Sequence, residues 1–122
     1  MSAATSFAVE MVQSDGTVEA GRLSEALRVS KAELAAASGL SRDAVSKTVR
    51  LRAPSTQARL RDIVDILSRV RPWCGSLPQA FAWYRAQPIP SFGDQTAEAL
   101  VKEGRAEAVK QYLDRIAVGG YA

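Results

Sequence analysis

Residues 31–50, KAELAAASGLSRDAVSKTVR, decide the fold of this chain, because they contain two short helical stretches separated by a glycine. Ala35 is small enough for two helices to approach closely, and Gly39 has the permissive backbone that a tight turn needs. The apolar positions that would bury the angle between the helices are Leu34, Leu40 and Val45. This pattern predicts a helix-turn-helix.

Both helix starts are encoded locally. Ser30 and Glu33 form an S-x-x-E capping box, and Ser41 can cap the second helix. A continuous second helix from Arg42 to about Arg50 would turn a defined set of side chains toward the domain. These inward residues would be Ala44, Val45, Thr48 and Val49.

The opposite face of this second helix carries cations and hydroxyls, which suit phosphates and the edges of bases. The alternative interpretation is that this charged face is an ordinary solvent-exposed helix surface without a ligand. We predict that the turn spacing and the charge together indicate DNA binding. The predicted DNA-binding residues are Ser41, Arg42, Ser46, Lys47, Arg50 and Arg52.

Positive charge is concentrated around this motif. Residues 1–21 carry three acids and no base, residues 22–71 carry eleven bases and five acids, and residues 72–122 carry five of each. The middle segment therefore has a net charge of +6 within a chain of net +3. DNA binding requires positive charge of this kind to neutralise the phosphates, so we predict that the affinity for DNA falls as the salt concentration rises.

Helical periodicity and turn signals predict an all-α fold with an Xre-like helix-turn-helix bundle followed by a small helical domain. Pro72, Gly75 and Pro78 suggest a boundary between the two parts. The predicted segments are a flexible N-terminal arm at 1–16, a DNA-binding domain at 17–71, a connector at 72–76 and a second domain at 77–122.

The predicted location is the cytoplasm. The chain has no run of about 18 apolar residues, and we expect a soluble protein without a membrane partner. Its single cysteine, Cys74, cannot form an intrachain disulfide, which fits a reducing compartment.

The C-terminal part resembles a known family. The pattern runs from Trp83 through Pro88-Ile89-Pro90, Phe92-Gly93, Thr96, Leu100-Val101, Gly104, Val109 and Leu113-Asp114-Arg115-Ile116 to Gly120-Tyr121. It is similar to the toxin-binding domain of Xre/MbcA/ParS-type antitoxins over residues 77–122. This resemblance implies a cognate RES-domain toxin that destroys NAD as the partner, and repression of a shared operon through operator DNA.

The family also implies that the C-terminal segment enters the active site of the toxin. This assigns neutralisation to Gly119, Gly120, Tyr121 and Ala122, with Arg115 and Ile116 leading into them. A diglycine lets a chain end enter a narrow cleft, although Gly119-Gly120 also fits a helix C-cap followed by a frayed end.

Aromatic residues add candidates for the toxin surface. Four of the eight aromatic residues lie between residues 81 and 92, a segment too short to enclose them all. We predict toxin contacts at Trp83, Pro90 and Phe92, and burial within an antitoxin dimer is the competing explanation. A homodimer within a hetero-oligomeric complex is expected, because helix-turn-helix proteins usually read two half-sites.

Catalysis is not expected. The chain has no histidine, which removes the commonest general base and zinc ligand, and it contains no nucleophile or phosphate-loop motif. We therefore predict no catalytic residue, no metal and no cofactor. The alternative function is a stand-alone helix-turn-helix repressor whose residues 77–122 form a dimerisation domain.

Overall fold

The computed structural model describes Phe7 and residues 10–120, and this part of the chain is helical without a named strand. The helices are α2 (Ala20–Leu27), α3 (Lys31–Ser38), α4 (Arg42–Ser46), α5 (Thr48–Leu51), α6 (Pro54–Cys74), α7 (Leu77–Ala86), α8 (Ala97–Lys102) and α9 (Ala106–Arg115). Two short helical turns, η1 (Pro90–Phe92) and η2 (Ile116–Gly120), complete the set. The all-α prediction is confirmed.

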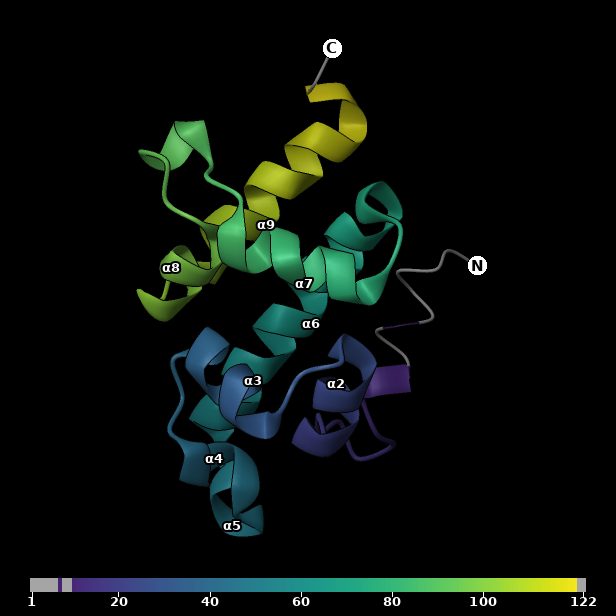
Figure 1. Cartoon of the computed structure of the whole chain (residues 1–122), viewed down its shortest axis with the longest axis vertical. Helices are drawn as coiled ribbons and strands as arrows, with labels where there is room; N and C mark the ends of the chain where they lie inside the picture. Colours follow the sequence, from purple (N-terminus) through teal and green to yellow (C-terminus); the bar gives the residue numbers. More distant parts are fainter. Residues whose placement is uncertain (1–6, 8–9, 121–122) are drawn as a thin grey trace.

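Helix α6 is the axis of the fold. Its 21 residues span about 30 Å, and it connects the helices near one end of the molecule to those near the other (Figure 1). Pro54 occupies the first turn, where its missing N–H costs nothing, and Ala53 is the N-cap. The hydroxyl residues Ser55 and Thr56, which the sequence also offers as caps after Pro54, lie inside the helix instead, because it starts at the proline.

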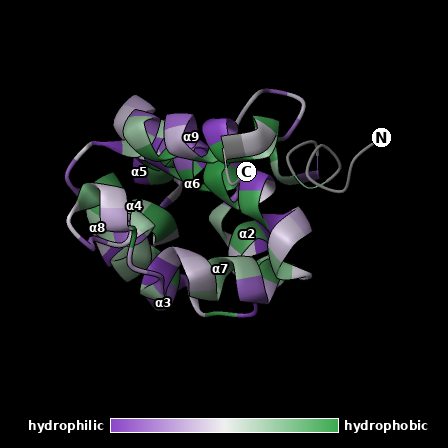
Figure 2. Cartoon of the chain, turned by 90° about the horizontal axis from the view of Figure 1, so that it is seen from above, coloured by the Kyte–Doolittle hydropathy of each residue, from purple (hydrophilic) through white to green (hydrophobic). Residues whose placement is uncertain are grey.

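One hydrophobic core spans both predicted domains. It includes Leu23, Leu34 and Val45 from the first part and Leu100 and Leu113 from the second. The apolar positions of α2, α6 and α7 meet in the middle of the molecule (Figure 2). Helix α6 also continues to Cys74, so the first three residues of the predicted connector are helical, and Gly75 ends the helix with a φ of 94°.

Polar contacts reinforce the joint between the two parts. The buried Tyr84 hydroxyl of α7 donates a hydrogen bond to the Ala37 carbonyl of α3 at 2.7 Å. Arg85 pairs with Glu98 of α8 at 2.7 Å and with Glu33 of α3 at 3.8 Å. Helix α7 therefore fastens α8 to the first helix of the predicted motif.

Ion pairs connect helix α9 to α6. Lys110, whose side chain is 14% exposed, lies 2.8 Å from Asp62 and 3.3 Å from Asp65 of α6. Burial opposes the charge on Lys110, but hydrogen bonds to Asp62 and Glu107 outweigh it and raise the pKa of the ammonium. Lys110 therefore stays charged and holds the base of the C-terminal helix.

The described part of segment 1–16 packs onto this fold. Phe7 and Met11 are buried in the core, and Val12 forms an isolated antiparallel bridge with Val18. The prediction of a loose arm therefore differs from the structure at these residues, because their apolar side chains join the hydrophobic core and are removed from water.

Candidate functional site

The helix-turn-helix has the caps and the turn that the sequence predicts. Ser30 accepts a hydrogen bond from the Glu33 amide at 3.0 Å, and Ser41 accepts one from the Ala44 amide at 3.1 Å. Gly39 adopts a left-handed conformation with a φ of 69°, which ends α3. These local signals place α4 after α3 at a fixed angle.

The second helix of the motif is broken at Lys47. The backbone there is extended, with φ −99° and ψ 125°, and it separates α4 from α5. The prediction of one continuous helix from 42 to 50 is therefore wrong. Because the break reorients α5, Thr48 and Val49 are exposed instead of turning inward, and Val49 is 85% exposed.

We call Arg42, Lys47 and Arg50 the basic tip, because all three are exposed in α4, at the break and in α5. Arg50 forms an ion pair with Asp43 at 3.6 Å, and both side chains are more than half exposed. Such a surface pair contributes little and can be exchanged for a phosphate contact. Within the described chain, Arg42 and Lys47 have no ion-pair partner at all.

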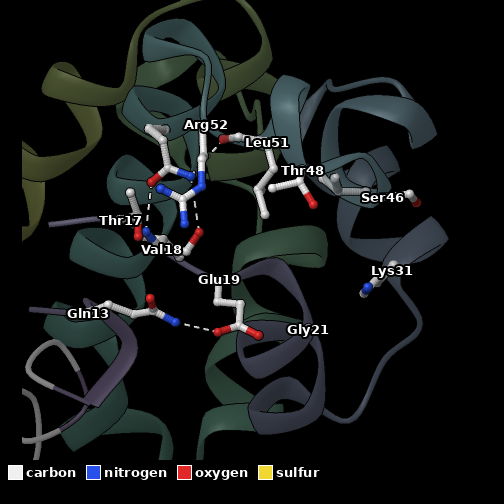
Figure 3. A pocket seen from close by; sticks show the side chains of 12 residues that line it. Gln13, Thr17, Val18, Glu19, Gly21, Lys31, Ser46, Thr48, Leu51 and Arg52 are labelled. Carbon is white, nitrogen blue, oxygen red and sulfur yellow. Dashed lines mark hydrogen bonds between the residues drawn. The ribbon is translucent and has the colours of Figure 1, made fainter. Parts of the chain in front are cut away.

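The other predicted DNA-binding residues are not part of the basic tip: Ser41, Ser46 and Arg52. The Ser41 hydroxyl is used as the cap of α4. Ser46 and Arg52 face a hollow of about 260 Å³ between the N-terminal segment and α4–α5 (Figure 3). Its lining residues are Gln13, Thr17, Val18, Glu19, Gly21, Lys31, Val45, Ser46, Thr48, Leu51, Arg52 and Gln57.

Arg52 is also held by an acid of the N-terminal turn. Its guanidinium lies 3.7 Å from Asp15. Hydrogen bonds from the Thr17 hydroxyl and amide lower the pKa of Asp15, and Arg52 adds to this effect. The structure therefore places Arg52 with the N-terminal segment, on another side of α5 from Arg50.

The predicted toxin-binding residues gather partly around α9. Phe92 of η1 contacts Tyr112 of α9 edge to face, with ring centroids 5.9 Å apart, and Arg105 lies 5.5 Å above the Phe92 ring. Tyr112 precedes Ile116 by one helical turn, so the two share a face. Pro90 is exposed beside Phe92 in η1.

The C-terminal turn η2 extends this surface. Arg115 is exposed and Ile116 is half-buried, while Val118 is 87% exposed. Gly119 is exposed with a φ of 104°, so the regular helix has ended before Gly120. Tyr121 and Ala122 lie outside the described residues.

Trp83 is not part of this group of contacts. It lies on α7, is half-buried and packs against the core, as a structural aromatic does. The sequence pattern missed Val49 and Val118, two of the three large exposed apolar residues in the described chain. Only Val118 had a sequence signal, since it directly precedes the diglycine.

Comparison with known proteins concerns the C-terminal part. Residues 73–119 match the family model of the antitoxin Xre/MbcA/ParS C-terminal toxin-binding domain. This part of the chain is similar to that domain family. The match supports an antitoxin with a toxin-binding C-terminal domain, and this antitoxin domain contains α7, α8, α9 and most of η2. No curated protein and no solved structure gave a significant match.

The described residues contain neither a metal site nor a membrane span. No group of three acidic, cysteine or histidine side chains that could hold a metal ion occurs among the residues with a described position. Over the same residues, no helix combines the length and hydrophobicity needed to cross a membrane.

Proposed function

We propose that this protein is an antitoxin that neutralises a cognate RES-domain, NAD-degrading toxin by placing its C-terminal segment in the toxin active site. We further propose that it represses its own operon through the helix-turn-helix, as a homodimer within a hetero-oligomeric complex. In this proposal residues 17–71 bind operator DNA and residues 77–122 bind the toxin.

One observation carries the neutralisation proposal: the matched toxin-binding domain ends in an exposed turn. Residues 73–119 match the family, and Ala117, Val118 and Gly119 at its end are all exposed. An exposed turn that has left regular helical geometry can fit into a cleft without unfolding α9. Phe92 and Tyr112 offer an aromatic surface at its base.

The positions of the two sites support a protein that uses both at once. The basic tip lies on α4 and α5 at one end of the long axis, and η2 lies at the other (Figure 1). Ligands at opposite ends do not collide. Helix α6 and the shared core connect the two ends.

Co-expression with the protein encoded by the adjacent reading frame, which we expect to be a RES-type toxin, tests the neutralisation. We expect the full chain to restore growth and cellular NAD, and a variant lacking residues 119–122 to fail at both. The matched control is the Lys47→Ala/Arg50→Ala variant, which changes only the opposite end and should neutralise normally. Full protection by the truncated chain would contradict the role of the C-terminal segment.

Operator binding is tested with the DNA upstream of the gene. We expect the Lys47→Ala/Arg50→Ala variant to bind more weakly, by about 1–3 kcal/mol for each side chain that reads a base, and with a shallower salt dependence. The truncated chain serves as the control and should bind normally. A protein that binds this DNA tightly but forms no complex with the toxin would instead support the stand-alone repressor.

A further inference from the structure

Val49 is an exposed apolar side chain that has exposed cations near it in the sequence. It is 85% exposed and stands between Lys47 and Arg50, which are both exposed cations. A single exposed apolar residue is ordinary on a protein surface. Val49 differs from such a residue in that its whole helix lies outside the core: α5 has no buried residue, so packing in the core does not explain an apolar side chain here.

The break at Lys47 is the cause of this exposure. In a continuous helix Val49 would face the domain, four residues after the buried Val45. The extended backbone of Lys47 rotates α5 instead, so that Thr48, Leu51 and Arg52 face the hollow and Val49 does not (Figure 3). Val49 and Arg50 therefore lie on the outer side of this short helix.

The end of α5 is anchored. The buried Gln57 side chain donates a hydrogen bond to the Leu51 carbonyl at 2.8 Å. The same amide donates to the Val18 carbonyl at 3.1 Å and accepts from the Val18 amide at 2.7 Å. Because Gln57 is held at three points, it fixes the position of the turn that presents Val49.

We propose that Val49 contacts the 5-methyl group of a thymine in the major groove and thereby contributes sequence preference. The proposal rests on the proposed operator binding. Thymine alone presents a methyl group there, and apolar side chains recognise it by contact. Lys47 and Arg50 on either side have the charge to neutralise phosphates, so Val49 is carried to the bases between them.

The test compares thymine with deoxyuridine, which lacks only this methyl group. A duplex is first selected from a randomised pool with the full chain, and each thymine is then replaced in turn. We expect one or two replacements to weaken wild-type binding by about fourfold, the equivalent of one buried methyl group. The shorter side chain of the Val49→Ala variant should make the deoxyuridine effect at those positions smaller than in wild type.

Val118→Ala is the matched control, because Val118 is equally exposed at the other end of the molecule. It should keep the full deoxyuridine effect. A deoxyuridine effect of the same size in wild type and Val49→Ala, or none in wild type, would overturn the Val49 proposal while operator binding stands. Failure of the wild type to select any duplex would overturn operator binding itself. Self-association that Val49→Ala abolishes without DNA would assign Val49 to a protein contact instead.

Discussion

Replacing Tyr84 with phenylalanine removes one hydroxyl from the joint between the toxin-binding domain and the helix-turn-helix. The hydroxyl is buried and donates to the Ala37 carbonyl at 2.7 Å. Ala37 lies in the last turn of α3, whose final four carbonyls have no partner within the helix. In the Tyr84→Phe variant this carbonyl stays buried and loses its donor.

The expected cost follows from that unsatisfied acceptor. A buried carbonyl that loses its hydrogen bond costs about 1–3 kcal/mol. The ring itself stays, so its stacking on Phe81 at 5.9 Å and its apolar burial are kept. With an unfolding entropy of about 0.26 kcal/mol per kelvin for 122 residues, the melting temperature should fall by about 4–12 °C.

Urea and thermal unfolding followed by circular dichroism measure this difference. Tyr112→Phe is the matched control, because Tyr112 is half-buried and should change stability by less than about 0.5 kcal/mol. Wild type should unfold in a single transition, because both parts share one core. Equal stability of the two variants would refute the assignment of Tyr84 as a stabilising joint.

Three further predictions concern the same fold. Lys110→Met should destabilise the protein by about 1–2 kcal/mol, because it leaves acids of α6 without their cation. The control is Lys102→Met, which removes a more exposed lysine from an i,i+4 ion pair and should cost less than about 0.5 kcal/mol. Urea titration measures both changes. Gly39→Ala should cost more than Gly93→Ala in the same titration. Both have a φ near 65–69°, but only at Gly39 would a Cβ meet side-chain atoms, at 3.0–3.1 Å. Burial raises the pKa of Tyr84 above its ordinary 10.0, so the unfolded chain ionises first. The stability advantage of wild type over Tyr84→Phe should therefore be complete below about pH 10 and shrink above it, and an advantage that grows with pH would contradict this linkage.

The two ends of the molecule differ in how far the sequence predicted them. At the C-terminal end, the resemblance of residues 77–122 to the antitoxin domain is confirmed by the family match at 73–119. Contacts such as Phe92 with Tyr112 were not predictable, because they join residues twenty positions apart through the packing of η1 on α9. The roles of the individual candidate residues at both ends stay predictions.

The sequence by itself determined the features that depend on neighbouring residues. Ser30 and Ser41 cap their helices as expected, and Gly39 makes the turn, because a cap or a left-handed glycine acts within four residues. The apolar residues of α6 recur in the sequence at helical spacing, and they lie on its buried face: Leu60, Ile63, Val64, Leu67 and Val70.

Only the tertiary structure decided where the local rules were broken. Helical periodicity predicted that Val49 faces the domain, but the extended backbone at Lys47 separates α5 from α4 and leaves Val49 exposed. Pro72 suggested a boundary, yet α6 runs past it. The position of α5 depends on Gln57, which contacts both Leu51 and Val18, and a contact between residues 39 positions apart cannot be read from the local pattern.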